Sequence, residues 1–580
     1  MKPLNVLNAV HFGVFTTVLA ASGPDQKPFL SHASADRAEV SLPSGIVIGS
    51  VVDGVEAFRG IPYAKPPEAD LRLEPPVRRE ADLGHFDATG PGPSCPQFGS
   101  FIPGETPGET PVLGGHGTGQ EDCLTITVQR PVGVSPDRAL PVLFWIYGGA
   151  FQFGSTEDYN ATDMLKAAVG LDRPFIFVAA NYRMGGFGFL GGREILAEGS
   201  ANLGLLDQRM ALEWTADNIA YFGGDPSKVV IWGESAGAIS VVDQLALFGG
   251  DPVYKGEPLF RGAIVNSGNV LPTDPVDCGK AQAIFDDIVE KLECSDANDK
   301  LKCLRAVGFE DFHTAVNSVP SADGITSLAL SYLPRPDVSV LPVSPDVAFE
   351  GGDYHAVPMI IGNQEDEGTL FAREEVHPDT TNAIVDYLQE YYFHNSNTEQ
   401  ITKLVNTWPN LAVSGSPFRT NLLYRRYAGY KRLSALLGDV VFILLRRLTL
   451  SFATTANKDI PIWSYMSSYL HDATGISGND QGTFHATDVF YGMFGLSNVV
   501  DLPGLPKLPY PIAQTRKYYL NFLYNLDPNK GLPVAKRWPT WEERNPKLLR
   551  FNILNIVEIN DDFREKSYDF IKENRADLYA

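Results

Sequence analysis

One serine lies in a pattern that can make it a nucleophile. Ser235 is at the centre of Gly233-Glu234-Ser235-Ala236-Gly237, between an apolar run at residues 229–232 and a helix-compatible run that begins at Ala236. A serine at a sharp strand-to-helix turn has a strained backbone and an exposed hydroxyl, and the flanking glycines avoid collisions across the turn. This context favours a catalytic serine over a serine in an ordinary glycine-rich turn.

A serine hydroxyl becomes a good nucleophile only when a base takes its proton and a carboxylate orients that base. In this kind of turn the three residues are expected in the order serine, acid, histidine. His485 follows Gly482-Thr483-Phe484 and precedes an apolar helix-like run, which suits a histidine at the carboxyl edge of a sheet. His471 remains an alternative on spacing. The other histidines after Ser235 are His313, His355, His377 and His394.

Three candidate acids follow the apolar run at residues 359–361, namely Glu365, Asp366 and Glu367. Glu367 precedes Gly368, and a glycine commonly turns the chain after a strand. The residue types alone leave all three open.

Acyl transfer also needs donors for the oxyanion, and a segment of small residues could supply them. Tyr147-Gly148-Gly149-Ala150 ends the strongest apolar run of the chain. Small residues let backbone N–H groups approach a carbonyl oxygen, and losing one such donor costs about 3 kcal/mol of transition-state stabilisation. Together with a nucleophile turn, this segment predicts an oxyanion loop.

The elements that must position these residues alternate along the chain. Apolar runs at residues 142–147, 175–179, 229–232, 263–265 and 359–361 are separated by helix-like segments such as 208–221 and 236–247. Runs that are apolar on both faces are typical of strands covered by helices on both sides. The alternation predicts an α/β fold with a mostly parallel sheet in one large domain. A Gly- and Pro-rich stretch at residues 96–122 predicts a surface loop, and residues 379–458 predict a helical insertion.

Longer blocks of sequence resemble the type-B carboxylesterase/lipase family of α/β-hydrolases over about residues 38–555. The most specific block is Phe222-Gly-Gly-Asp-Pro-Ser-Lys-Val-Val-Ile-Trp-Gly-Glu-Ser-Ala-Gly237. Glu121-Asp-Cys-Leu124 matches a second block, although Thr127 stands where Asp, Asn or Ser is usual, and Asn202-Leu-Gly-Leu-Leu-Asp-Gln208 matches another. The resemblance implies the α/β-hydrolase fold and a carboxylic-ester hydrolase that needs no cofactor or metal.

Position by position, the resemblance implies a role for each candidate. Ser235 would be the nucleophile, Glu367 the acid and His485 the base. The oxyanion donors would be Gly149, Ala150 and Ala236, with Ala150 in the place of a usual glycine. The family's two disulfides would be Cys95–Cys123 and Cys294–Cys303, and Cys278, the fifth cysteine, would remain a free thiol.

Residues 331–337, Ser-Tyr-Leu-Pro-Arg-Pro-Asp, resemble the fungal lipase/esterase branch. The loop between Cys95 and Cys123 corresponds to the lid of those lipases, but it is short, rich in Gly and Pro and without an amphipathic helix pattern. We therefore expect an esterase for soluble or modestly hydrophobic esters. An interfacially active lipase or sterol esterase is the main alternative. A non-hydrolytic acyltransferase and a catalytically silent cholinesterase-like binding protein are the others.

The N-terminus predicts export. Lys2 precedes an apolar stretch at residues 6–20, and small residues allow cleavage after about Ala20, which leaves a single domain at residues 21–580. A buried N-terminal helix is the alternative. In a secreted chain the sequon Asn160-Ala161-Thr162 predicts a glycan on Asn160.

The formal charge of −23, from 47 basic and 70 acidic residues, opposes binding of nucleic acid and of acidic membranes. No further stretch of the sequence is apolar enough for a membrane span. We expect a small-molecule ester as the partner, and the sequence leaves the oligomeric state open.

Overall fold

The computed structural model describes residues 37–98, 117–469, 480–489 and 510–579. Arg37–Ala580 forms one compact unit. The predicted signal sequence and its cleavage site lie outside the described residues, so that boundary stays a prediction. Among the described helices, none is both long and apolar enough to cross a membrane.

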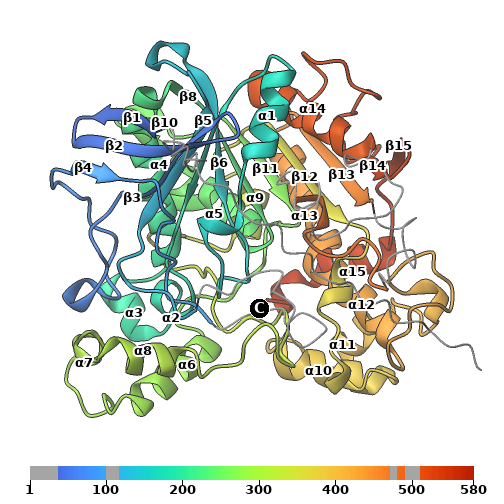
Figure 1. Cartoon of the computed structure of the whole chain (residues 1–580). Coiled ribbons are helices and arrows are strands. Elements are labelled where there is room, and N and C mark those ends of the chain that lie inside the picture. The colour runs from blue at the N-terminus through green and yellow to red at the C-terminus, as the bar shows by residue number, and fades with distance from the viewer. Residues whose placement is uncertain (1–36, 99–116, 470–479, 490–509, 580) are drawn as a thin grey trace, which may run out of the picture. The chain divides into compact units, whose positions relative to one another are not determined.

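Within the described residues, thirteen strands form one mixed sheet in the order β1-β2-β3-β5-β7-β6-β8-β11-β12-β13-β14-β15, with β4 paired to β2 (Figure 1). The strands from β7 through β14 in this order are parallel, whereas β1, β2, β3, β5 and β15 pair antiparallel with their neighbours in this order, and β4 pairs parallel with β2. Their bounds are β1 Arg37–Leu42, β2 Gly45–Val52, β3 Val55–Pro62, β4 Gly84–Asp87, β5 Thr125–Pro131, β6 Leu140–Ile146, β7 Ile176–Ala180, β8 Gly224–Glu234, β11 Gly262–Asn266, β12 Met359–Gln364, β13 Ile462–Ser468, β14 Lys547–Asn552 and β15 Ile556–Asn560. A separate hairpin pairs β9 Val253–Tyr254 with β10 Glu257–Pro258.

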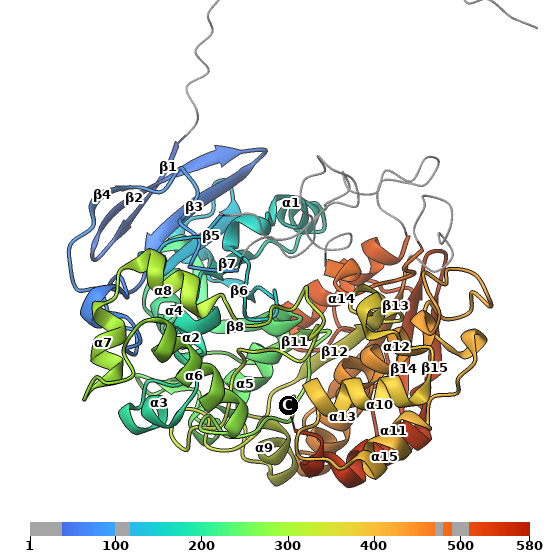
Figure 2. The same cartoon turned by 90° about the horizontal axis from the view of Figure 1, so that it is seen from below.

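Helices lie on both faces of this sheet, and Figure 2 shows α1 and α14 on one side and α4, α5 and α13 on the other. The helices are α1 Thr162–Gly170, α2 Gly185–Gly188, α3 Arg193–Glu198, α4 Leu203–Asn218, α5 Ala236–Gly250, α6 Gly279–Lys291, α7 Lys300–Ala306, α8 Phe309–Val316, α9 Pro345–Gly351, α10 Thr381–Tyr391, α11 Thr398–Val405, α12 Tyr430–Gly438, α13 Leu444–Ala456, α14 Tyr510–Asn525 and α15 Glu565–Asn574.

The predicted α/β fold is confirmed, and the central strands that lead to the candidate site are buried as expected. Every residue of β6, β7, β11 and β12 is buried, because helices cover both faces of the central strands. The expected helix at residues 208–221 is shifted, since α4 already begins at Leu203 and ends at Asn218, after which a short 3-10 turn leads into β8.

The expected helical insertion at residues 379–458 contains α10, α11, α12 and α13, but it is not helical throughout. Residues 406–429 form mainly turns and irregular chain between α11 and α12. A π-helical turn, η8 Asp439–Ile443, joins α12 to α13.

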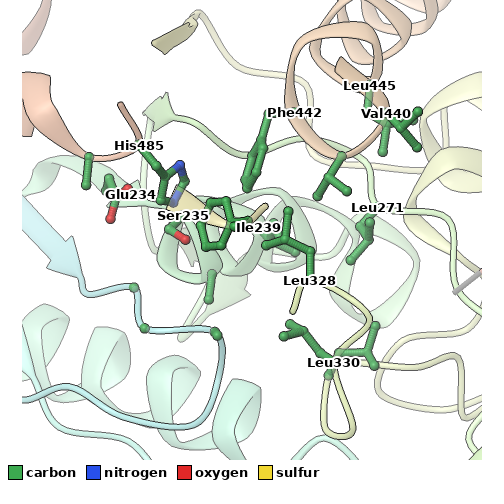
Figure 3. Close-up of a pocket in the computed structure, with 18 of the residues that line it drawn as sticks. Glu234, Ser235, Ile239, Leu271, Leu328, Leu330, Val440, Phe442, Leu445 and His485 are labelled. Carbon is green, nitrogen blue, oxygen red and sulfur yellow. Dashed lines mark ion pairs between the residues drawn. The ribbon is translucent and has the colours of Figure 1, made fainter. Parts of the chain in front are cut away.

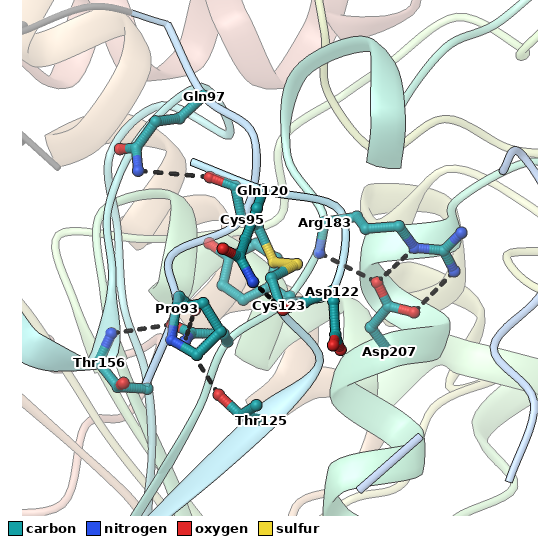
Figure 4. Close-up of a disulfide and its surroundings, with 12 residues drawn as sticks. Pro93, Cys95, Gln97, Gln120, Asp122, Cys123, Thr125, Thr156, Arg183 and Asp207 are labelled. Atoms are coloured by element: carbon teal, nitrogen blue, oxygen red, sulfur yellow. Dashed lines mark hydrogen bonds and ion pairs between the residues drawn. A yellow bond between two sulfur atoms is a disulfide. The ribbon is translucent and has the colours of Figure 1, made fainter. Parts of the chain in front are cut away.

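The structure pairs the cysteines as the resemblance implies, with Cys95–Cys123 and Cys294–Cys303 bonded and Cys278 a free, half-buried thiol. Figure 4 shows the first disulfide beside a buried ion pair, in which Arg183 Nη2 lies 2.7 Å from Asp207 Oδ1. Asp207 belongs to the block at residues 202–208 that resembles the family. The loop that the first disulfide closes lies largely outside the described residues, which include none of residues 99–116.

Candidate active site

Ser235 lies between the end of β8 and the start of α5, as the motif predicts. Its backbone has φ 56° and ψ −127°, a combination that a residue with a side chain rarely adopts. Ser235 N–H donates to Asn266 O on β11 at 2.9 Å, and Ser235 O accepts from Ile239 N–H in the first turn of α5. The sheet and the helix together therefore hold the strained turn in place.

The two glycines of the motif are required by close packing. A Cβ at Gly233 would lie 2.3 Å from Gly237 O, across the turn. A Cβ at Gly237 would lie 2.1 Å from Ile146 O, at the end of β6. Either contact is far below van der Waals distance, so a larger residue at these positions would displace the turn that carries Ser235.

The predicted oxyanion loop follows β6 and packs against the same turn. A Cβ at Gly148 would lie 2.6 Å from Glu234 O, and one at Gly149, whose φ is +110°, would lie 2.0 Å from Phe153 O. Ala150 has φ 56° and is half-buried beside the pocket that contains Ser235. Ala236 is the first residue of α5, where the helix dipole favours negative charge. The backbone N–H groups of Gly149, Ala150 and Ala236 thus belong to segments that meet at Ser235.

Glu367 and His485 meet although 118 positions separate them. Glu367 begins the 3-10 turn Glu367–Leu370 that follows β12, and its Oε2 lies 2.5 Å from His485 Nδ1. Its other oxygen, Oε1, accepts from Ser267 Oγ at 2.6 Å and from Gln364 N–H at 2.7 Å. Both carboxylate oxygens are therefore occupied, and the orientation of Glu367 toward the imidazole is fixed.

The two neighbouring acids point elsewhere. Glu365 pairs with the guanidinium of Arg419. Asp366 accepts from Phe418 N–H at 2.8 Å and from Thr483 N–H at 2.9 Å, so it fastens the loop that carries His485. Burial raises the pKa of Asp366 to about 7. Of the three acids that the sequence leaves open, Glu367 alone hydrogen-bonds to His485 among the described residues.

Two other candidate histidines have partners outside this cluster. His313 Nε2 lies 2.9 Å from Gln97 O, and His355 contacts Phe260. His471 lies outside the described residues. The structure thus brings His485 together with Ser235 (Figure 3) and with Glu367, whereas it does not describe the position of His471.

A second acid reaches the imidazole from the opposite side, and the sequence reasoning missed it. Glu234 Oε1 lies 3.2 Å from His485 Nε2, and both side chains are almost fully buried. Burial raises the pKa of Glu234 to about 8. For His485, burial opposes protonation, but the negative charges of Glu234 and Glu367 outweigh it and raise the pKa. Glu234 occupies a variable position of Gly-x-Ser-x-Gly, so its acidic side chain next to the serine was the only available signal.

A pocket lined almost entirely by apolar side chains extends from these residues into the molecule (Figure 3). Ser235, Glu234 and His485 lie at one end, and Ile239, Leu271, Leu328, Leu330, Val440 and Leu445 continue the lining. Phe442 packs against the His485 ring with centroids 4.6 Å apart. The sequence did not reveal this pocket, because its walls come from at least five separate segments.

Comparison with known proteins identifies the family of this chain. The sequence model of the Carboxylesterase family matches residues 36–571. The chain belongs to the carboxylesterase family. This membership confirms the predicted α/β-hydrolase fold and makes the chain a carboxylic ester hydrolase.

Three fungal proteins are similar to this carboxylesterase. The chain is 50% identical to "Secreted triacylglycerol lipase LIP1" of Gibberella zeae, over 94% of this chain and 91% of that protein. It is 46% identical to "Secreted lipase 1" of Botryotinia fuckeliana, over 95% of both chains. The crystal structure of Aspergillus niger EstA superposes with a TM-score of 0.77 at 27% identity, covering 94% of this chain and 99% of that chain.

Proposed function

We propose that this chain is a serine ester hydrolase in which Ser235 attacks the ester carbonyl and forms an acyl-enzyme. The proposal rests chiefly on the position of His485, between the carboxylate of Glu367 and the strained turn of Ser235. This is the arrangement that nucleophilic catalysis by a serine requires.

In this mechanism, His485 Nε2 takes the proton of Ser235 Oγ as the oxygen bonds to the carbonyl carbon. Glu367 accepts a hydrogen bond from His485 Nδ1–H and stabilises the imidazolium. The N–H groups of Gly149, Ala150 and Ala236 donate to the oxyanion of the tetrahedral intermediate. His485 then gives its proton to the departing alcohol, and water hydrolyses the acyl-enzyme by the same steps.

We further propose a lipase-like preference for long acyl chains. The composition of the loop between Cys95 and Cys123 favours soluble or modestly hydrophobic esters, but most of that loop lies outside the described residues. The pocket offers an extended aliphatic wall next to Ser235, which stabilises a hydrocarbon chain by about 0.8 kcal/mol per buried methylene. The two fungal relatives above are named lipases, one of them for triacylglycerol.

Secretion belongs to the same proposal, since both relatives are named as secreted and residues 1–20 carry a signal-peptide pattern. Asn160 is exposed, as a glycan acceptor must be.

A series of para-nitrophenyl esters from butanoyl to stearoyl tests both parts of the proposal, with native protein beside Ser235→Ala. We expect hydrolysis that rises toward long acyl chains in the native protein and is lost with every ester in Ser235→Ala. Activity retained in the variant would overturn the mechanism, and an optimum at butanoyl would overturn only the long-chain preference. Quantifying free acid against new ester in the presence of an added alcohol separates hydrolysis from acyl transfer.

A further inference from the structure

The C-terminal tail of the chain contributes to the lining of the apolar pocket. The lining includes Ile571 of α15, Arg575, and Leu578 just beyond the 3-10 turn Arg575–Asp577. Ile571 and Leu578 are 3% and 7% exposed, so both side chains are buried in this wall. Figure 2 shows that the chain ends between α9 and α13, on the same face of the sheet as α5.

A continuous set of apolar side chains connects this wall to the reacting groups. Phe442 contacts His485, and Leu445 lies one helical turn further along the same helical segment. That segment continues as α13, which packs against α15. A hydrocarbon chain that starts at Ser235 and follows this lining therefore approaches Ile571 and Leu578.

Polar contacts hold the tail in this position. Arg575 Nε lies 2.9 Å from the buried carboxylate of Asp346 on α9, and the same guanidinium also pairs with Glu350. On the other side, Ser396 Oγ donates to Asp577 O at 2.5 Å, and Gln400 Nε2 donates to its carboxylate at 2.7 Å. The tail is thus tied both to α9 and to the start of α11.

The charges beside the tail also determine which chemical groups the pocket can bind there. Among the described residues of the lining, Arg575 is the one arginine or lysine, and two carboxylates neutralise it. A second anion, such as the terminal carboxylate of a dicarboxylic half-ester, would meet no unpaired positive charge from Arg575. The end of the pocket therefore suits the methyl end of a fatty acyl chain.

From these contacts we infer that the tail at residues 575–579, with Leu578 as its apolar contact, is the end wall of the acyl pocket and sets the longest acyl chain accepted. This inference rests on the proposed function, because it takes the pocket to hold the acyl group. Leu578 acts on specificity and not on the chemical step.

The test changes the size of the wall and measures chain-length selectivity. Leu578→Trp fills the end of the pocket, and Leu578→Ala opens it. Leu554→Trp is the matched control, because Leu554 lies in the turn between β14 and β15 and is 79% exposed. Titration with a small phosphonate counts competent sites, so rates are compared per folded active site.

We expect Leu578→Trp to lower the ratio of palmitoyl to butanoyl kcat/KM by about tenfold or more. Leu578→Ala should raise the ratio of stearoyl to palmitoyl kcat/KM, and Leu554→Trp should leave both ratios unchanged. Equal ratios in all three variants and the native protein, or the same shift in Leu554→Trp, would overturn the inference. The proposed mechanism would stand in that case, since loss of all hydrolysis in Ser235→Ala tests it separately.

Discussion

Nδ1 of His485 lies 2.5 Å from Oε2 of Glu367, and Nε2 of the same ring lies 3.2 Å from Oε1 of Glu234. The imidazole is thus placed between two buried acids, one after β12 and one at the end of β8. Nε2 lies on the side of Glu234, which directly precedes Ser235, and we expect this nitrogen to exchange a proton with the serine hydroxyl.

Glu367→Gln should lower kcat by about 10⁴, because an amide cannot fix the imidazole tautomer as a carboxylate does. Glu365→Gln is the matched control, since Glu365 pairs with Arg419 and has no contact with His485 among the described residues. Steady-state kinetics with one chromogenic ester measures both variants. Equal losses in the two would argue that this segment acts through folding and not through the catalytic hydrogen bond.

The pH profile should show the raised pKa of His485. Catalysis needs the neutral imidazole, and a raised pKa keeps the ring protonated to higher pH. We therefore expect kcat/KM to fall with decreasing pH through an apparent pKa above the ordinary value of about 6.5.

In Glu234→Gln, the acid beside Nε2 that contributes to the raised pKa of His485 is replaced by a neutral amide, so the acid limb of that profile should move toward lower pH. A limb that stays in place or moves upward would show that Glu234 does not set the protonation of His485. Glu365→Gln again serves as the control that should leave the limb unchanged.

The Cys95–Cys123 disulfide should stabilise the fold. The 28-residue separation predicts a loss of about 3–4 kcal/mol in the free energy of unfolding for the double alanine variant. Cys278→Ala removes the free thiol and should change stability little. Urea unfolding followed by fluorescence measures both, and a Cys278→Ala loss as large as that of the double variant would contradict the assignment.

The sequence predicted the part of this site that depends on local chemistry. The turn of Ser235 could be predicted because its strand, glycines and helix are adjacent in the sequence. The close contacts of Gly233 and Gly237 follow from the same motif. The acid that contacts His485 could not be predicted from residue types, because Glu365, Asp366 and Glu367 are all acidic and adjacent in the sequence. The resemblance to the family indicated Glu367, and the turn after β12 gives the physical reason.

Features built from distant segments were not predictable. Glu234 approaches His485 because the end of β8 and the loop that carries His485 meet at the carboxyl edge of the sheet. Likewise, Leu578 lines the pocket in a tail that is held partly by the pairing of Arg575 with acids on α9, more than two hundred residues earlier. Periodicity reports which face of an element is buried, but not which other element covers it.

Covalent labelling tests the central claim, that Ser235 is the nucleophile, most directly. Native protein is incubated with para-nitrophenyl diethyl phosphate, released para-nitrophenol is counted per chain, and the modified peptide is identified by mass spectrometry. We predict one equivalent released, a diethylphosphoryl group on Ser235, and no stoichiometric release from Ser235→Ala. A label on another residue, or an undiminished burst from the variant, would contradict the account.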